Sequence, residues 1–300
     1  MEEWEQQEFL KIYRFSMFTT DTLKGKTILI TGGGSGLGLA MAKGFCKTGS
    51  DIVICGRTAE KLEKAAEEIR LEREGAKVQG FSVDVRNHQS VSEMFDKVIS
   101  DFGHIDGLVN NAAGNFLSAS EDLSPGGFKA IVDIVLHGTF NCTHTFGNYL
   151  INNKREGSIL NIVTTYAEHG SSFVLPSACA KAGVLAMTKS LAHEWAEYGI
   201  RVNAIAPGPF QTKGAWARLV PDSMVEKMMV KQIPLKRLGQ KEELANLAIF
   251  LMSDLVPYIT GESVVIDGGE SLKAGQFNFV TDVMSRKKLK MAFKAMKPKK

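Results

Sequence analysis

The chain lacks any long hydrophobic run. None of its 300 residues fall in a stretch of about 18 consecutive apolar residues, the length that a membrane-spanning helix needs. Its first residues, Met1-Glu2-Glu3-Trp4-Glu5, are too acidic for a signal or transit peptide, and the terminal Pro298-Lys299-Lys300 differs from a Ser-Lys-Leu peroxisomal address. We therefore expect no stable membrane insertion and a cytoplasmic location, with an organellar form left open because a presequence can be removed by processing.

Cysteine is scarce, and the pairs that would bind metal are absent. The four cysteines are scattered through apolar patterns without a C-x-x-C pair, and the six histidines form no H-E-x-x-H motif. Buried free thiols are therefore expected in preference to zinc or disulfides, and no metal site is predicted. The body of the chain also lacks interleaved basic and aromatic residues, so no nucleic-acid partner is expected.

Positive charge is concentrated at the C-terminal end. Residues 285–300 contain eight Lys or Arg and no acid. Because the whole chain has a net charge of +3, the other residues together have a net charge of −5. We favour a solvated terminus here. The near-helical spacing of Leu289, Phe293 and Met296 leaves a second interpretation open, a basic amphipathic helix that contacts an anionic surface or phosphates.

What the chain does contain is a repeated alternation of β-rich and helical patterns, typical of βαβ units and a parallel sheet. Strands are expected at residues 26–31, 51–55, 78–83, 107–110, 158–164, 201–206 and 263–266. The main helical patterns cover residues 58–74, 128–152, 177–198 and 241–253. No internal linker interrupts them, so we predict one α/β domain over residues 24–272, preceded by an N-terminal extension at 1–23 and followed by a basic tail at 273–300.

A glycine-rich turn follows the first strand and opens a helical pattern, at Thr31-Gly32-Gly33-Gly34-Ser35-Gly36-Leu37-Gly38. Glycines at such a turn let the backbone approach a pyrophosphate, whose charge is met by the amides of the helix N-terminus. The same turn could serve only as a tight connection. The strand before it and the helix after it favour dinucleotide binding.

The end of the second strand decides between the two nicotinamide dinucleotides. A free ribose 2′-hydroxyl would call for an acidic acceptor, but Gly56 provides none, and Arg57 can form charge-assisted bonds to a 2′-phosphate. NADPH is therefore the predicted cofactor, unless Arg57 is an ordinary loop cation. Asp84 and Val85, at the end of the third strand, fit the wall of an adenine pocket.

The most informative position is Ser177 in Ser177-Ala178-Cys179-Ala180-Lys181. A nicotinamide-dependent reductase of this layout would usually have Tyr-x-x-x-Lys there, and the nearest tyrosine, Tyr166, lies fifteen residues before the lysine. With the glycine turn, Asn110-Asn111-Ala112-Ala113-Gly114 and Pro207-Gly208 in the same order, the chain resembles the short-chain dehydrogenase/reductase family over residues 24–272. The resemblance implies a single-domain Rossmann-like, doubly wound sheet of about seven strands flanked by helices, a cofactor crevice at the carboxyl ends of the strands, and frequent homotetramers. A second departure is Val135, where the family usually has a helix asparagine.

The departures themselves resemble the 2,4-dienoyl-CoA reductase subgroup, together with residues 110–117, 166–168, 176–183, 207–214, 267–270 and 275–278. This resemblance implies NADPH-dependent reduction of a fatty 2,4-dienoyl-CoA to a 3-enoyl-CoA in the β-oxidation of unsaturated acyl chains. The implied catalytic residues are Tyr166, Lys181, Asn115 and Ser177. The implied cofactor contacts are Gly32, Gly33, Gly34, Ser35, Gly36, Leu37, Gly38, Arg57, Asp84, Val85, Asn111, Ala112, Lys181, Pro207, Gly208, Pro209, Phe210 and Thr212. The implied substrate contacts are Arg57, Arg86, Phe116, Ser124 and Arg218, of which Arg86 and Ser124 could also be a surface cation and a helix N-cap.

The displaced tyrosine has a chemical reason. In ketone reduction hydride reaches the carbonyl carbon itself, so the proton donor must lie beside the nicotinamide. In dienoyl thioester reduction hydride reaches the δ carbon, and charge develops on a thioester oxygen several bonds away. Tyr166 and Asn115, which follow the fifth and fourth strands, could meet at that oxygen. Two alternatives stay open: another acyl-thioester reductase, acting on 2-enoyl-CoA or 3-oxoacyl substrates, and a dinucleotide-binding pseudoenzyme.

Overall fold

A parallel sheet of seven strands forms the centre of the molecule, in the order β3-β2-β1-β4-β5-β6-β7. The computed structural model describes residues 18–212, 222–275 and 277–296. The strands are β1 Thr27–Thr31, β2 Asp51–Gly56, β3 Val78–Ser82, β4 Gly107–Asn110, β5 Gly157–Ile162, β6 Ile200–Pro207 and β7 Ser263–Ile266. Each lies within two residues of its predicted bounds, and the predicted fold class is confirmed.

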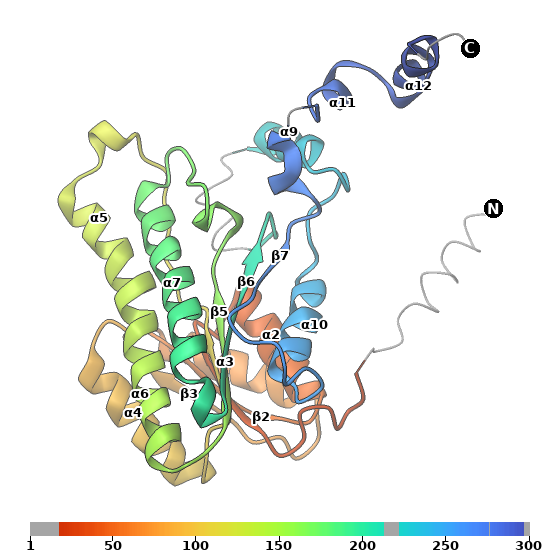
Figure 1. Ribbon diagram of the computed structural model, residues 1–300. Helices are drawn as coiled ribbons and strands as arrows, with labels where there is room; N and C mark the ends of the chain where they lie inside the picture. Colours follow the sequence, from red (N-terminus) through yellow and green to blue (C-terminus); the bar gives the residue numbers. More distant parts are fainter. Residues whose placement is uncertain (1–17, 213–221, 276, 297–300) are drawn as a thin grey trace.

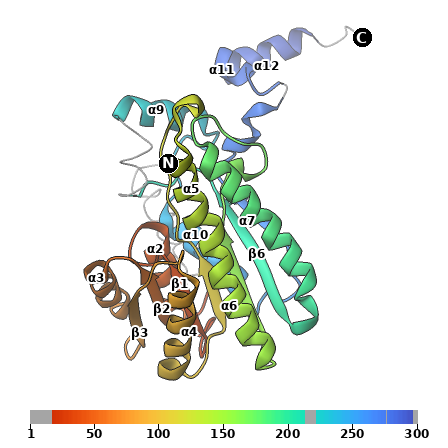
Figure 2. The same ribbon diagram turned by 90° about the vertical axis from the view of Figure 1, so that its left-hand side faces the viewer.

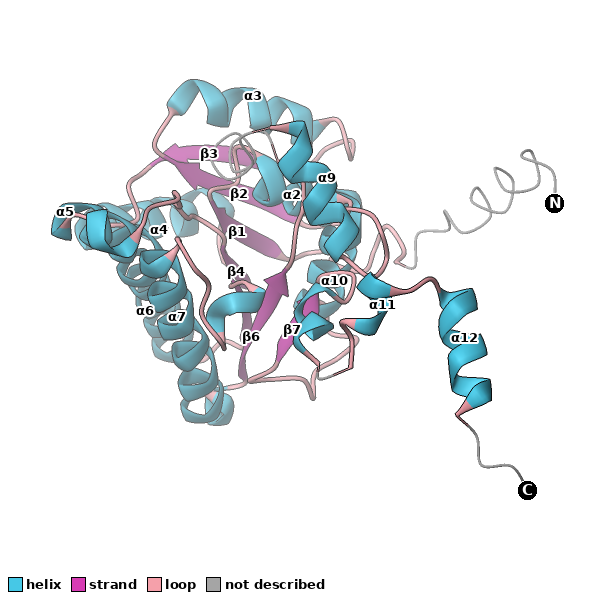
Figure 3. Ribbon diagram, turned by 90° about the horizontal axis from the view of Figure 1, so that it is seen from above, coloured by secondary structure: helices cyan, strands magenta, loops and turns pink. Residues whose placement is uncertain are grey.

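Helices cover both faces of the sheet (Figure 1, Figure 3). One layer contains α2 Gly36–Lys47, α3 Ala59–Arg70 and α10 Lys241–Met252, and the other contains α4 His88–Phe102, α6 Gly138–Asn152 and α7 Leu175–Glu194. Successive side chains of a strand point to opposite faces of the sheet, so the residues of β1 pack alternately against the two helix layers. Ile28 and Ile30 pack on the side of α2, α3 and α10, and Leu29 packs on the side of α4 and α6. All five residues of β1 are buried, as expected for a central parallel strand.

A continuous helical rod runs through residues 125–152 and contains an irregular turn. It begins with α5 Pro125–Val132, passes through a π-turn at Asp133–His137 and continues as α6. The sequence predicts its start at residue 128, but Pro125 at the first turn and Ser124, whose Oγ accepts from Gly127 N at 3.0 Å, begin the helix earlier. Val135 lies in the π-turn and is fully buried.

Shorter elements connect and follow the sheet. They are the 3-10 turns Ser120–Asp122, Thr165–Ala167 (η3), Ala196–Tyr198 and Glu270–Ala274, and the helices α9 Ser223–Gln232, α11 Val280–Val283 and α12 Arg286–Ala295. Figure 2 shows α11 and α12 extending away from the sheet-and-helix body. Among the described residues, no helix is long and apolar enough to cross a bilayer.

Two residues of the predicted N-terminal extension belong to the packed body. Phe18 and Leu23 are 5% and 0% exposed and join the core between the sheet and α2, and Leu23 N donates to Thr48 O at 2.7 Å. The boundary at residue 23 stays a prediction, since residues 1–17 lie outside the described part.

The strand order reverses between β1 and β4, and this reversal positions the site. Chain segments leave the carboxyl ends of these two adjacent strands toward opposite faces, which opens a crevice above the sheet. A cavity of about 870 Å³ lies there. Its wall is formed by the loops that follow β1, β2, β3, β4, β5, β6 and β7, together with α7 and α9.

Candidate active site

The glycine turn holds the chain in a conformation that side chains would obstruct. Gly32 and Gly36 have φ of +66° and +59°, a region that favours glycine. A Cβ on Gly38 would lie 2.5 Å from Gly32 O, and one on Gly33 would lie 2.4 Å from Ile54 Cγ2. Ser35 caps α2 without a side-chain bond to its amides, so the first amides of the helix stay open to a ligand.

Asn111 and Thr31 join the loops after β4 and β1. Asn111 Nδ2 donates to the carbonyls of Thr31 at 3.0 Å and Gly32 at 3.2 Å, while Thr31 Oγ1 accepts from the amides of Asn111 and Ala112 at 3.0 and 2.9 Å. These bonds fix the floor of the crevice where the strand order reverses. They explain why an asparagine and a threonine occupy these positions.

A ladder of buried polar side chains supports this floor from beneath. Asn110 Nδ2 donates to Thr143 Oγ1 at 2.8 Å and to Asn161 Oδ1 at 2.9 Å, and Asn161 Nδ2 donates to Thr188 Oγ1 at 2.8 Å. The four residues lie on α6, β4, β5 and α7. Sequence reasoning missed the ladder because its members are far apart in the chain, although two asparagines in otherwise apolar strands were a usable signal.

Arg57 lies at the cavity wall as an exposed side chain, beyond the last residue of β2. Within the residues that the structure describes it forms no ion pair. Arg86 behaves differently, because its guanidinium binds both oxygens of Asp84, with Nη2 2.5 Å from Oδ2. That hydrogen bond lowers the pKa of the Asp84 carboxyl. Among the described residues that line the cavity near Asp84, Arg57 is therefore a cation whose charge no acid neutralises.

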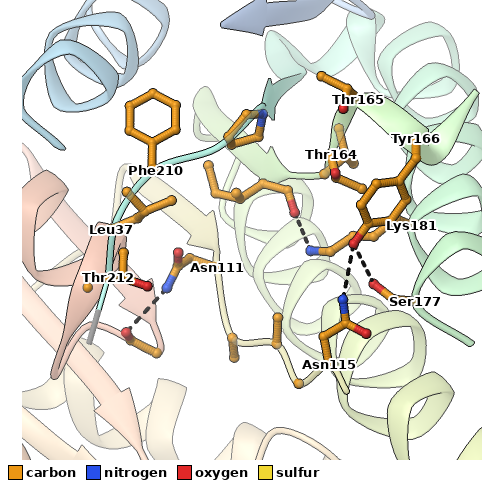
Figure 4. A pocket seen from close by; sticks show the side chains of 18 of the residues that line it. Leu37, Asn111, Asn115, Thr164, Thr165, Tyr166, Ser177, Lys181, Phe210 and Thr212 are labelled. Atoms are coloured by element: carbon orange, nitrogen blue, oxygen red, sulfur yellow. Dashed lines mark hydrogen bonds between the residues drawn. The ribbon is translucent and has the colours of Figure 1, made fainter. Parts of the chain in front are cut away.

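The four predicted catalytic residues come together at the other end (Figure 4). Tyr166 is carried by the short turn η3 directly after β5, and its Oη accepts a bond from Asn115 Nδ2 at 3.2 Å and lies 3.1 Å from Ser177 Oγ. Asn115 belongs to the loop after β4, and its Oδ1 accepts from Phe116 N at 2.9 Å, which fixes the orientation of the amide. Two polar side chains therefore hold the phenol from two different elements.

Lys181 is buried below Tyr166 on α7, with 8% of its surface exposed. Its Nζ donates to the carbonyl of Ile162 at the end of β5. Burial lowers the pKa of this ammonium from 10.5 to about 8. Lys181 is therefore not a solvent-exposed lysine of an amphipathic helix.

Most of the predicted cofactor residues line the cavity. They are Gly32, Ser35, Gly36, Leu37, Arg57, Asp84, Val85, Asn111, Ala112, Lys181, Pro207, Gly208, Pro209, Phe210 and Thr212. Gly33, Gly34 and Gly38 do not reach its surface. Of the predicted substrate residues, Arg57 lines the cavity, whereas Arg86, Phe116 and Ser124 lie outside its wall, and Ser124 caps α5. Arg218 lies outside the described residues.

The sequence did not single out the residues that line the cavity after η3 and β7. His169, Gly170 and Ser171 contribute one group, and Glu270, Ser271 and Lys273 the other. Burial raises the pKa of the Glu270 carboxyl, and the nearby Asp267 adds to this effect. The Asp267-Gly268-Gly269-Glu270 motif was noted, but nothing in it indicated which carboxylate faces the cavity.

Comparison with known proteins agrees with this architecture. Residues 32–271 match the family model described as enoyl-(acyl carrier protein) reductase. A Caenorhabditis elegans protein named probable 2,4-dienoyl-CoA reductase 3, (3E)-enoyl-CoA-producing, is 45% identical over 267 residues, which cover 88% of this chain and 86% of that protein.

Solved structures agree as well. A short chain dehydrogenase from Bacillus anthracis is 46% identical, with a TM-score of 0.76 over 83% of this chain and 97% of its own. A gluconate 5-dehydrogenase from Burkholderia cenocepacia, in complex with NADP and tartrate, is 34% identical, with a TM-score of 0.78 over 84% and 98%. With its sheet order, glycine turn and Tyr166–Lys181 site, the chain belongs to the short-chain dehydrogenase/reductase family and is an oxidoreductase.

Proposed function

We propose that the protein is an NADPH-dependent 2,4-dienoyl-CoA reductase that converts a fatty 2,4-dienoyl-CoA to a 3-enoyl-CoA in the β-oxidation of unsaturated acyl chains. The observation that carries the proposal is the Asn115–Tyr166–Ser177 cluster, in which the acid comes from the loop after β5 and a serine replaces it on α7. The resemblance to a relative named for this reaction supports it.

The cavity fits a dinucleotide with a 2′-phosphate. Close glycine contacts and open helix amides suit a pyrophosphate at α2, and Arg57 would pair with the phosphate on the adenine side. Lys181 would bind the nicotinamide ribose at the opposite end. A free 2′-hydroxyl has no acidic acceptor at Gly56, which favours NADPH over NADH.

Bound NADPH would supply the hydride for the δ carbon of the substrate. The residues of this chain would manage the charge that then develops on the thioester oxygen. Tyr166 Oη and Asn115 Nδ2 would both donate to that oxygen, an effect worth about 3–4 kcal/mol per donor in comparable oxyanion sites. Asn115 already donates to the phenol oxygen, so that bond does not use the phenol proton, which can point to Ser177 Oγ or to the substrate. Protonation of the α carbon, by water or through Tyr166, would complete the reaction.

Ser177 has two effects in this arrangement. Its small side chain leaves space for the acyl chain where a tyrosine would fill it, and its hydroxyl lies 3.1 Å from Tyr166 Oη. With 3% of its surface exposed, Ser177 is held on the first turn of α7 and cannot swing out to solvent. It would therefore orient the phenol toward the thioester.

The proposal extends to the rest of the substrate and to the assembly. Coenzyme A carries phosphates that need cations, for which we propose Arg57, Arg86 and Arg218, with Phe116 and Ser124 beside the pantetheine. Arg86 would have to share its guanidinium with Asp84. We also propose a homotetramer, as is common in the family, and a cytoplasmic location, with an organellar form as the alternative.

The experiment is NADPH oxidation by the purified protein with a 2,4-dienoyl-CoA, a 2-enoyl-CoA and a 3-oxoacyl-CoA. We expect turnover of the dienoyl thioester, with a 3-enoyl product, and a loss of about a hundredfold or more in kcat/KM for Tyr166→Phe, from the removal of one oxyanion donor. Tyr258→Phe is the matched control, because that ring is fully exposed.

Each other outcome points elsewhere. Preference for the 2-enoyl or 3-oxoacyl substrate would replace the proposal with another acyl-thioester reductase. Tight NADPH binding without turnover of any thioester would leave a dinucleotide-binding pseudoenzyme. A dienoyl activity that survives Tyr166→Phe would mean that another group stabilises the oxygen.

A further inference from the structure

The C-terminal segment carries many apolar side chains that the body does not cover. Within residues 277–296, those at least 45% exposed are Phe277, Phe279, Val283, Met284, Met291, Phe293 and Met296. Isolated exposed apolar residues are common in folded proteins, but a cluster of this size within twenty residues needs a partner.

The helix α12 is amphipathic and begins with a serine N-cap. At its start, the side chain of Ser285 accepts a long hydrogen bond from Lys288 N at 3.5 Å. The spacing of Leu289, Phe293 and Met296 places them on one side of the helix. Lys287 and Lys294 lie on the opposite side together with the exposed Met291, while Arg286, Lys288 and Lys290 flank the apolar side. None of these five cations forms an ion pair with any residue in the described part of the chain, so their charge is available to a ligand.

The segment leaves the body beside the cavity. Lys273, which lines the cavity, pairs through Nζ with Asp282 of α11 at 3.2 Å. Figure 1 shows α11 and α12 beyond the carboxyl ends of the strands, on the side of the molecule where the cavity lies. An external surface in contact with α12 would therefore lie on the same side of the protein as the cavity.

We propose that α12 is a peripheral anchor that docks the protein reversibly on an anionic phospholipid bilayer. Its apolar side would enter the boundary between headgroups and acyl chains, and its lysines and arginine would contact the phosphates and carboxylates of the headgroups. Ten residues cannot span a bilayer, so the contact is interfacial. Charge complementarity favours an anionic bilayer as the partner, because residues 285–300 carry eight cations and no acid. The inference does not depend on the proposed reaction.

The test uses the full chain in vesicle sedimentation. Vesicles of phosphatidylcholine alone are compared with vesicles that contain about one-third phosphatidylserine. We expect at least about tenfold tighter binding to the anionic vesicles, and a loss of that difference at high salt. The double variant Lys287→Glu/Lys290→Glu should abolish the preference for anionic vesicles. Phe293→Ser should weaken binding to anionic vesicles.

The matched control is Lys61→Glu/Lys64→Glu, an exposed pair with the same spacing on α3, which should bind as the unaltered protein does. Thermal unfolding of all variants checks that the body is intact. Equal binding to neutral and anionic vesicles, no binding at all, or unchanged binding of the α12 variant would overturn the proposal. If Lys287→Glu/Lys290→Glu instead abolishes a salt-sensitive self-association without vesicle binding, α12 docks on a second copy of the chain and the bilayer proposal fails.

Discussion

Replacement of Lys181 by methionine is expected to stabilise the cofactor-free protein at neutral pH while removing its activity. The ammonium lies in the body with 8% of its surface exposed, and burial lowers its pKa from 10.5 to about 8. A buried charge of this kind is retained for function at the expense of stability. Methionine keeps most of the side-chain volume and removes the charge.

The size of the effect follows from the two pKa values. Because the folded value lies below the unfolded one, the unfolded chain binds more protons between about pH 8 and pH 10.5, so stability from this group rises with pH across that window. Below about pH 8, the folded protein is destabilised by the full free energy of burying the charged Lys181. A fall of the pKa from 10.5 to about 8 corresponds to about 3 kcal/mol, which is an order-of-magnitude value.

The assay is urea unfolding of the unaltered protein and Lys181→Met at about pH 7 and about pH 10.5. We expect the advantage of the variant at neutral pH to exceed that at alkaline pH by up to about 3 kcal/mol. Loss of the bond to the Ile162 carbonyl opposes this gain, more at neutral pH where the donor is charged, so about 3 kcal/mol is an upper value. Lys189→Met, an exposed position on the same helix, should show no such pH dependence. A stability difference that is equal at the two pH values would refute the reasoning.

Three further predictions concern the rest of the site. Gly38→Ala should weaken NADPH binding by about tenfold or more in a fluorescence titration, because the added Cβ would meet Gly32 O at 2.5 Å; the open position Gly126→Ala should leave binding unchanged. Asn161→Leu should lower the free energy of unfolding in urea by about 2–4 kcal/mol, since it removes two buried hydrogen bonds, whereas the exposed Asn148→Leu should not. Arg57→Ala should raise the Kd for NADPH by about tenfold and leave that for NADH unchanged; equal changes for both would remove Arg57 from the 2′-phosphate site.

The sequence predicted the sheet well because its strands carry two independent signals. The apolar runs fall between glycine and proline breaks, and the motifs that follow β1, β4 and β6 occur in the order that a doubly wound sheet requires. The meeting of Tyr166 and Asn115 was also foreseeable, because the carboxyl ends of adjacent parallel strands lie at one edge of the sheet; the contact with Ser177 depends on how α7 packs.

Other features depend on packing that a single sequence does not record. The π-turn at Asp133–His137 has no proline or paired-glycine signal, and Val135 in it looks like any core residue. The burial of Lys181 cannot be read from α7, whose apolar residues are spread around the helix rather than on one side. The pairing of Arg86 with Asp84 depends on the loop conformation after β3, which residue types alone do not specify.

The placement of Tyr166 on η3 rather than on α7 separates two tasks within the molecule. Lys181 and the glycine turn are anchored to a long helix and a central strand, while Tyr166, the proposed acid, is carried by a three-residue turn that joins β5 to the segment before α7. Insertions or exchanges in residues 165–174 can therefore change how far Tyr166 reaches without moving the residues that we propose bind the dinucleotide. Under the proposed function, changes in this one connecting segment would adapt the same fold to substrates whose carbonyl lies at different distances from the carbon that accepts hydride.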